Sequence, residues 1–325
     1  MRVLLTGASG FIGSHVARLL QSQGCTVYAL VRPTSDLWRI QDVIPSLKIV
    51  RGDLTLREEI KAQLKSIQPD LCIHLAWFEE IGGSLCSPGN IDALVSGLDL
   101  VRELVAVGCR RILIAGTCVE YDTTLGYLSE TSPTKAESLY AITKHALHIV
   151  ADQFVRGIDA ELIWFRFFSL YGPFEDERRL VPSIILPLLR NDVAKVTPGA
   201  QVRDYLYVED AAAAVCALAM SRFTGTINVA SGRPISVGDL AMKIGTILNK
   251  RELVSLGALP YRESEPMFVC ANIDRIRDVT GWSPRFDLDA GLRQTIEWWK
   301  TRKDAASSVV KQKKETPHGT MDRAK

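Results

Sequence analysis

Tyr140 and Lys144 are the two residues of this sequence whose types and spacing are best suited to chemistry. Residues four positions apart lie on one face of a helix, so the lysine ammonium would stand beside the phenol. A free tyrosine has a pKa of roughly 10, and a neighbouring cation lowers it by stabilising the phenolate. Such a phenol can donate a proton to a carbonyl oxygen whose carbon accepts a hydride. The pair therefore predicts reduction or oxidation at a carbonyl or alcohol carbon, although this spacing also arises by chance on helix surfaces.

A glycine-rich turn near the N-terminus predicts where a hydride carrier would bind. Thr6 to Gly13 reads Thr-Gly-Ala-Ser-Gly-Phe-Ile-Gly; it follows the apolar run Met1 to Leu5 and precedes a helical pattern from Ser14 to Gln23. Glycines allow a tight turn and a close approach of the backbone to a pyrophosphate. The helix start then offers unpaired N–H groups to the phosphates. The spacing Gly-x-x-Gly-x-x-Gly departs from the usual pattern by one residue, but its place after a first strand favours a dinucleotide site over an ordinary turn.

The end of the second predicted strand indicates which dinucleotide binds. In an NAD site, an acidic residue about 20 positions after the glycines contacts the ribose 2′-OH. Residues 14–35 contain no Asp or Glu, and Arg32 follows the strand instead. A planar guanidinium can grip a 2′-phosphate. The sequence predicts NADP as the cofactor, with NAD as the alternative; a solvated surface arginine is the other interpretation of Arg32.

The elements that must position these residues alternate between strand and helix through about residue 170. The predicted strands are Val3–Leu5, Thr26–Leu30, Leu47–Arg51, Leu71–Leu75, Arg111–Ala115 and Glu161–Phe167. The predicted helices are Ser14–Gln23, Leu56–Ile67, Asn90–Val107 and Leu139–Arg156. This order predicts an α/β fold of Rossmann type, a doubly wound parallel sheet with ligands at the carboxyl ends of its strands.

Domain boundaries follow from where the alternation stops. We expect a dinucleotide-binding domain over residues 1–172, rejoined by about 205–236. Proline and loop signals multiply after Gly172, so residues 173–204 and 237–300 are expected to form a smaller C-terminal α/β substrate-binding domain. Residues 303–325 are polar and lysine-rich, without apolar periodicity, and are predicted to be a disordered tail.

Composition narrows the classes of protein. The net charge of +2 is well mixed along the 325 residues, which argues against nucleic-acid or membrane partners. No secretory signal or membrane-length apolar run is visible. The seven cysteines form no Cys-x-x-Cys pair, which indicates a reducing, cytoplasmic compartment. His145 and His148 share a helix face, but the sequence shows no acidic or thiol group beside them, so no metal site is predicted.

Taken together, these residues resemble the extended short-chain dehydrogenases/reductases, the NAD(P)-dependent epimerases, dehydratases and reductases of nucleotide-sugars. The resemblance covers about residues 1 to 300. Beyond the glycine turn and the Tyr-Lys pair, the matching segments are Gly52-Asp53-Leu54, His74-Leu75-Ala76-Trp77, Asn90, Arg166 to Pro173, Arg203 to Asp210 and Gly281-Trp282-Ser283-Pro284.

The resemblance implies a set of site residues. The implied catalytic residues are Thr117, Tyr140 and Lys144, with the Thr117 hydroxyl bonding the substrate oxygen unless it caps a turn. The implied cofactor contacts are Gly7, Gly10, Phe11, Ile12, Gly13, Arg32, Ser35, Asp53, Leu54, Leu75, Ala76, Trp77, Tyr140, Lys144 and Phe167. The implied substrate contacts are Trp77, Thr117, Ser169, Arg203 and Arg262.

Some of these residues carry further expectations. Arg203 and Arg262 would hold the nucleotide diphosphate, since a guanidinium forks onto two phosphate oxygens. The alternative for each is a structural salt bridge, to Asp204 or Glu265. In similar proteins, the helices at 90–107 and 139–156 pair across a two-fold axis, so a homodimer is expected. Their apolar residues could instead be buried within one chain.

The residues after Thr117 indicate which of the family's activities this chain can perform. Sugar 4,6-dehydratases resemble this stretch but carry Asp-Glu next, the acid and base for eliminating water, where this chain has Cys118 and Val119. Fucose-synthase-like epimerase/reductases place a cysteine one residue later, so Cys118 is expected to be a packing residue. Glu120 has no role in this pattern.

The expected activity is therefore an NADP-dependent reduction of a nucleotide-linked 4-keto-6-deoxyhexose, with Tyr140 as proton donor. A nucleotide-sugar 4-epimerase is the alternative. A non-catalytic NADP-binding protein is the contrasting class, against which the intact Thr117, Tyr140 and Lys144 argue.

Overall fold

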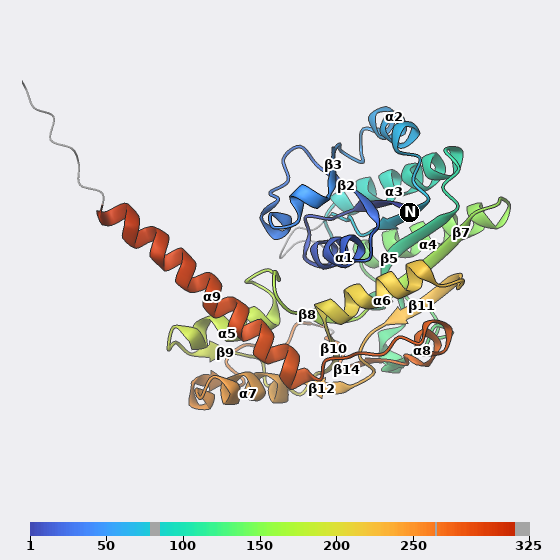
Figure 1. Ribbon diagram of the computed structural model, residues 1–325. Coiled ribbons are helices and arrows are strands. Elements are labelled where there is room, and N and C mark those ends of the chain that lie inside the picture. Colours follow the sequence, from blue (N-terminus) through green and yellow to red (C-terminus); the bar gives the residue numbers. More distant parts are fainter. Residues whose placement is uncertain (79–84, 264, 316–325) are drawn as a thin grey trace, which may run out of the picture.

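The computed structural model describes residues 1–78, 85–263 and 265–315. Its centre is a seven-stranded sheet in the order β11-β7-β5-β4-β1-β2-β3, with every neighbouring pair parallel (Figure 1). These strands are β1 (Arg2–Thr6), β2 (Thr26–Val31), β3 (Lys48–Arg51), β4 (Leu71–His74), β5 (Arg111–Thr117), β7 (Glu161–Phe167) and β11 (Gly225–Val229). The predicted Rossmann-type, doubly wound fold is confirmed.

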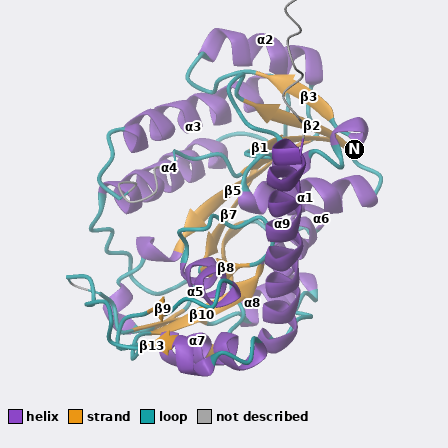
Figure 2. Cartoon of the chain, turned by 90° about the vertical axis from the view of Figure 1, so that its left-hand side faces the viewer, coloured by secondary structure: helices purple, strands orange, loops and turns teal. Residues whose placement is uncertain are grey.

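Helices cover both faces of this sheet, as Figure 2 shows. The helices are α1 (Phe11–Ser22) and α6 (Val208–Met220) on one face, and α2 (Arg57–Ile67), α3 (Gly89–Ala106) and α4 (Leu139–Arg156) on the other. Strand side chains alternate between the two layers. Val3 and Leu5 pack with α1 and α6, whereas Leu4 packs with α2, α3 and α4.

A smaller second lobe is built mostly from the chain after β7, joined by one short strand that precedes β7. Its five-stranded sheet has the order β12-β10-β14-β6, with β8 paired to β10. The strands are β6 (Tyr127–Leu128), β8 (Ser169–Tyr171), β10 (Val202–Tyr207), β12 (Pro234–Ser236) and β14 (Phe268–Ala271), and a separate pair is β9 (Ala194–Lys195) and β13 (Val254–Ser255). The later helices are α5 (Leu180–Leu189), α7 (Val237–Ile247), α8 (Asp274–Thr280) and α9 (Leu288–Glu315). Short 3₁₀ turns are η1 (Trp38–Ile40), η2 (Ile44–Ser46), η3 (Cys118–Glu120), η4 (Thr123–Leu125) and η5 (Arg251–Leu253).

The chain returns to the first domain over a shorter segment than the expected 205–236. Helix α6 and strand β11 complete the large sheet and its core. Strands β10 and β12, at the two ends of the expected segment, belong to the second sheet. The reason is that β10 pairs with β8, which itself continues directly from β7 and leads the chain across.

The C-terminal segment differs from its predicted disorder. Helix α9 continues through Glu315, so residues 303–315 are helical rather than part of a disordered tail. This stretch contains four lysines and two alanines, which are strong helix formers, and it extends a helix already anchored in the core by Leu292 and Trp299. Residues 316–325 lie outside the described part of the chain. Within the described residues, no helix combines the length and the apolar character that crossing a membrane requires.

Candidate active site

A cleft of about 590 Å³ opens at the carboxyl ends of β1 to β4. Its position is the one where parallel α/β sheets bind ligands. The lining includes every predicted cofactor residue that precedes Tyr140 in the chain, namely Gly7, Gly10, Phe11, Ile12, Gly13, Arg32, Ser35, Asp53, Leu54, Leu75, Ala76 and Trp77. Tyr140, Lys144 and Phe167 do not line it.

The glycine turn forms the floor of this cleft. Gly7 has a φ of +74°, and a Cβ there would lie 2.7 Å from the backbone nitrogen of Ala76. A Cβ at Gly13 would lie 2.0 Å from the Gly7 carbonyl oxygen. Helix α1 begins at Phe11 without a side-chain cap and without an acidic residue in its first turn. Its N-terminus can therefore receive an anionic group, and the turn fits the pyrophosphate of a dinucleotide.

Charges of both signs lie in the cleft beyond the end of β2. Arg32 and Ser35 line it as predicted, and so does Asp36. One oxygen of Asp36 also accepts the N–H of Trp38 at 3.0 Å. Asp36 directly follows the stretch 14–35, which contains no Asp or Glu, and precedes the 3₁₀ turn η1. Its carboxylate is suited to a ribose hydroxyl.

The predicted proton donor and its lysine begin helix α4. Ser138 caps this helix by accepting the Ala141 N–H at 3.2 Å. The Lys144 side chain is buried, and its Nζ donates to the Ala115 carbonyl of β5 at 2.8 Å. Burial lowers the pKa of Lys144 to about 7. The lysine therefore stands near the point between its charged and neutral forms, where it is sensitive to neighbouring charges.

Trp77 forms the wall between the cleft and this helix. Its ring centroid lies 3.7 Å from Lys144 Nζ, and its ring meets that of Tyr140 edge-on at 6.4 Å. Its Nε1 donates to Asn90 Oδ1 at 2.9 Å, which fixes the plane of the indole. The cation–π contact stabilises the ammonium where water is excluded. Trp77, which lines the cleft, is therefore the residue that joins it to Tyr140 and Lys144 on α4.

Thr117 is the last residue of β5 and also the cap of η3. Its hydroxyl accepts the Val119 N–H at 3.5 Å, and its own N–H donates to Glu120 at 2.8 Å. Thr117 therefore does cap the turn, as the alternative interpretation required, but the bond of 3.5 Å is long and weak. The next residue, Cys118, is a thiol whose pKa burial raises to about 12. Such a thiol does not act as a base at neutral pH.

The predicted substrate residues of the second lobe lie outside the cleft lining. Arg203 Nη2 pairs with Glu265 at 2.5 Å, so its structural alternative is present, with Glu265 rather than Asp204 as the partner. The charge of Arg203 lowers the pKa of Cys118, but burial has the larger effect and raises it. Ser169 pairs with Tyr205 between β8 and β10, and Arg262 is exposed. Arg203 is therefore engaged in a salt bridge within the second lobe, and Arg262 lies at the surface.

His74 and Glu120 are two buried groups that sequence reasoning left without roles. His74, at the end of β4, bonds Thr6 Oγ1 through Nδ1 at 2.7 Å, and that oxygen also accepts the Ala76 N–H at 3.1 Å. Burial, together with the charge of Lys144, lowers the pKa of His74 to about 3, so this imidazole is neutral. It ties the wall of the cleft to the glycine turn. A buried histidine on an apolar strand gave no functional signal in the sequence.

Comparison with known proteins agrees with this geometry. A family model described as the NAD dependent epimerase/dehydratase family matches residues 3–230. The chain is 24% identical to a UDP-glucuronate 4-epimerase of Thermodesulfobacterium geofontis, over 94% of this chain and 98% of that protein. It is 26% identical to the CDP-abequose synthase of Salmonella typhimurium, over 91% and 97%. The solved Thermus thermophilus UDP-glucose 4-epimerase in complex with NAD has the same fold, with a TM-score of 0.83, 23% identity, and coverage of 92% of this chain and 99% of that one.

Proposed function

Because the chain belongs to the NAD-dependent epimerase/dehydratase family, we propose that it is an NADP-dependent ketoreductase of nucleotide-linked 4-keto-6-deoxyhexoses. The observation that carries this proposal is the pair of residues after Thr117. Cys118 is a half-buried thiol whose pKa is raised by burial to about 12, and Val119 has no proton to exchange. A dehydratase needs an acid and a base at this place to eliminate water, so reduction of a ketone that already exists is the simpler chemistry here.

The proposed mechanism assigns a task to each of the three reacting residues. A bound nicotinamide would supply the hydride to the carbonyl carbon of the sugar. The Tyr140 hydroxyl donates its proton to the oxygen that becomes an alkoxide, and the Lys144 ammonium stabilises the phenolate left behind. The Thr117 hydroxyl holds the same substrate oxygen. Solvent then returns a proton to Tyr140, so the net reaction consumes one hydride and one proton.

The proposed cofactor site is the cleft. The glycine turn and the start of α1 would receive the pyrophosphate. Asp53, Leu54, Leu75 and Ala76 line the cleft and would contact the rest of the dinucleotide. Arg32 and Ser35 receive a 2′-phosphate, which favours NADP. The nucleotide-sugar lies on the side of the second lobe, with Trp77, Thr117, Ser169, Arg203 and Arg262 as its proposed contacts.

A nucleotide-sugar 4-epimerase is the second candidate. Asp36 lines the cleft near Arg32 and could hold a ribose 2′-OH, as NAD requires. Two of the similar proteins named above are 4-epimerases. An epimerase would use the same Thr117, Tyr140 and Lys144, but it oxidises and then reduces one carbon and returns its cofactor unchanged.

One assay separates the two candidates. The enzyme is mixed with NADPH and a nucleotide-linked 4-keto-6-deoxyhexose, and the absorbance of the reduced cofactor is followed. We expect one NADPH to be consumed for each molecule of product, since reduction is not reversed within the cycle. Interconversion of two hexose epimers without any net change in cofactor would instead establish the epimerase.

A further inference from the structure

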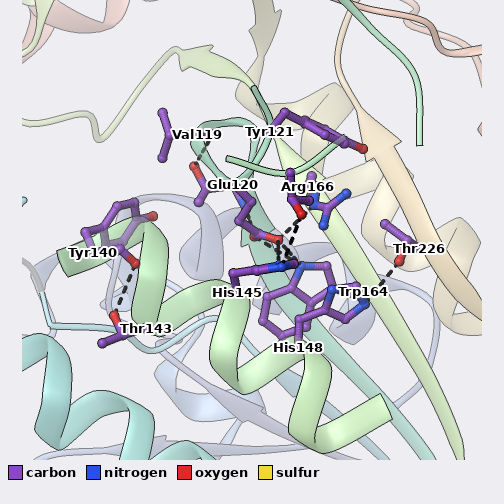
Figure 3. Close-up of polar contacts among 12 residues, drawn as sticks. Val119, Glu120, Tyr121, Tyr140, Thr143, His145, His148, Trp164, Arg166 and Thr226 are labelled. Carbon is purple, nitrogen blue, oxygen red and sulfur yellow. Dashed lines mark hydrogen bonds and ion pairs between the residues drawn. The ribbon is translucent and has the colours of Figure 1, made fainter. Parts of the chain in front are cut away.

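Glu120, on the 3₁₀ turn that follows Thr117, is a buried carboxylate, and Figure 3 shows it facing Arg166, Trp164 and His145. The Glu120 side chain is fully buried, and one of its oxygens accepts the backbone N–H of Thr117 at 2.8 Å. The other accepts Nε of Arg166 at 2.8 Å. Trp164 Nε1 lies 3.1 Å from both oxygens. A carboxylate with this many donors is held in one orientation.

The backbone makes room for this group at Gly116. A Cβ at this position would lie 2.7 Å from Glu120 Oε1 and 2.2 Å from Trp164 Nε1. Any larger residue would therefore displace the carboxylate or the indole. Since Gly116 immediately precedes Thr117, the same short stretch of β5 carries both the reacting hydroxyl and the space for its support.

Two histidines of α4 complete the cluster. His145 Nδ1 lies 3.9 Å from Glu120 Oε2, and the Nδ1 atoms of His145 and His148 are buried without a hydrogen-bond partner. The sequence-based statement that no acidic group lies beside His145 and His148 is therefore wrong. Glu120 and the two histidines lie close enough together to offer one ligand atom each to a metal ion. However, both oxygens of Glu120 already accept N–H groups, and Arg166 already supplies a cation. The carboxylate is engaged by the protein itself.

Glu120 also acts on Lys144, the residue that precedes His145 on α4. Burial lowers the pKa of Lys144, and the negative charge of Glu120 raises it in part. The geometry places the two charges on the same short stretch of β5. Lys144 Nζ donates to the Ala115 carbonyl, and Glu120 accepts the N–H of Thr117, two residues further along the strand. Of the other titratable groups nearby, His74 of β4 is neutral, and Arg166 of β7 is paired with Glu120 itself.

We propose that Glu120 is a positioning residue, which orients the Thr117 turn through its backbone N–H and supplies the countercharge that keeps Lys144 an ammonium. This proposal rests on the proposed function, since it assumes that Thr117, Tyr140 and Lys144 perform the reaction. It gives one side chain two tasks that different substitutions separate. The negative charge of Glu120 acts on Lys144, and the length of the Glu120 side chain determines whether it reaches the Thr117 N–H.

Two variants test these tasks. Glu120→Gln keeps the length but removes the charge, and it leaves Arg166 without its anionic partner. We expect the pKa of Lys144, and with it the alkaline limb of the pH profile of kcat, to move down by about one unit. Glu120→Asp keeps the charge but is one methylene too short to reach Thr117. We expect kcat to fall about 10- to 100-fold with the alkaline limb unmoved.

The titration of Lys144 is read directly from the ¹³C shift of its Cε by NMR, with the signal assigned by its absence in Lys144→Met. This readout requires no turnover, so an inactive wild type would count against the proposed function and still leave the role of Glu120 to be decided. Glu130→Gln is the matched control. Glu130 is also a buried carboxylate, accepting the Asn228 N–H at 2.9 Å with Arg275 at 3.7 Å, and it should move neither readout.

An unchanged Lys144 pKa in Glu120→Gln would overturn the countercharge, and an undiminished kcat in Glu120→Asp would overturn the positioning. If Glu120→Gln does not fold, as judged by circular dichroism, the Glu120→Asp arm still decides. A shift of equal size in Glu130→Gln would show a general loss of packing and would also overturn the proposal.

Discussion

Trp77 decides how the cofactor cleft meets the proton donor. Its ring covers the Lys144 ammonium at 3.7 Å. An aromatic face attracts a cation most strongly when water is excluded, so Trp77 offsets part of the cost of burying Lys144. The same ring meets Tyr140 edge-on. The proposed sugar site beside the phenol would therefore be bounded by an indole.

The proton donor gives a direct prediction. Tyr140→Phe removes the hydroxyl and keeps the ring that packs on Trp77, so the fold and cofactor binding should survive. Turnover should fall by about 10²- to 10⁴-fold, the usual contribution of general acid catalysis. Stopped-flow or steady-state oxidation of NADPH measures this loss. Lys144→Ala is the comparison variant and should impair cofactor binding as well, because its ammonium is expected to contact the nicotinamide ribose. Near-normal turnover in Tyr140→Phe would refute the mechanism.

Arg32 gives a second prediction at the same scale. Arg32→Asp removes the cation proposed for the 2′-phosphate and adds a second acid near Asp36. NADPH should bind about 10-fold or more weakly and NADH should bind better, because one charged hydrogen bond to a phosphate contributes at least this much. Fluorescence titration with both cofactors measures the change. A wild type that binds NADH more tightly than NADPH would show that Asp36, rather than Arg32, sets the preference.

The elements bring the three reacting residues together through the meeting of β5 and α4. Thr117 ends β5, while Tyr140 and Lys144 lie in the first two turns of α4. The bond from Lys144 to the Ala115 carbonyl ties this helix to the strand two residues before Thr117. The Ser138 cap sets where the helix starts. A residue inserted between Tyr140 and Lys144 would rotate Tyr140 away from Lys144 on the helix.

An aromatic contact between α9 and η1 joins the small lobe to the large one. Trp298 of α9 stacks on Trp38 of η1 at 6.4 Å and meets Phe174 at 5.1 Å. Arg302 lies 3.9 Å above the Trp38 ring. Phe174 begins the segment that brings Glu175 and Asp176 to the cleft. This aromatic contact therefore joins the lobes beside the proposed cofactor site, far along the chain from the glycine turn.

For the whole molecule, the exposed faces of α3 and α4 predict a homodimer. Several of their large apolar side chains are 41–55% exposed, namely Ile91, Val95, Ile142, Ile149, Val150 and Phe154. Val101 and Leu104 of α3 are buried inside the chain, as the alternative interpretation of these helices required. A contiguous apolar face on two neighbouring helices is stabilised when a second copy covers it.

Sedimentation velocity at micromolar concentration tests this prediction. We expect the wild type to sediment as a dimer and Ile149→Glu to sediment as a monomer, because a charge buried in the interface is costly. Val193→Glu, at a site 50% exposed outside these two helices, is the matched control and should remain a dimer. A wild type that is a clean monomer would contradict the proposed interface.

The sequence by itself determined the family, the fold class and most of the cleft, because these depend on local patterns. Strand-helix alternation sets a doubly wound sheet, and the glycine spacing sets a turn whose close contacts no other residue could occupy. Tyr140 and Lys144 needed only helical periodicity to be paired. Each of these inferences concerns residues that lie near one another in the chain or at the ends of successive strands.

Only the tertiary structure decided what Glu120, Trp77 and Arg203 contact. Glu120 meets Arg166 and His145 across 25 to 46 positions of sequence, and Arg203 meets Glu265 across 62. No local periodicity relates such distant residues, since their distances depend on how β7, α4 and the second lobe pack together. The charge state of Lys144 likewise follows from burial and from neighbours on other elements. For this protein, local sequence placed the reacting groups, and packing set the environment that tunes them.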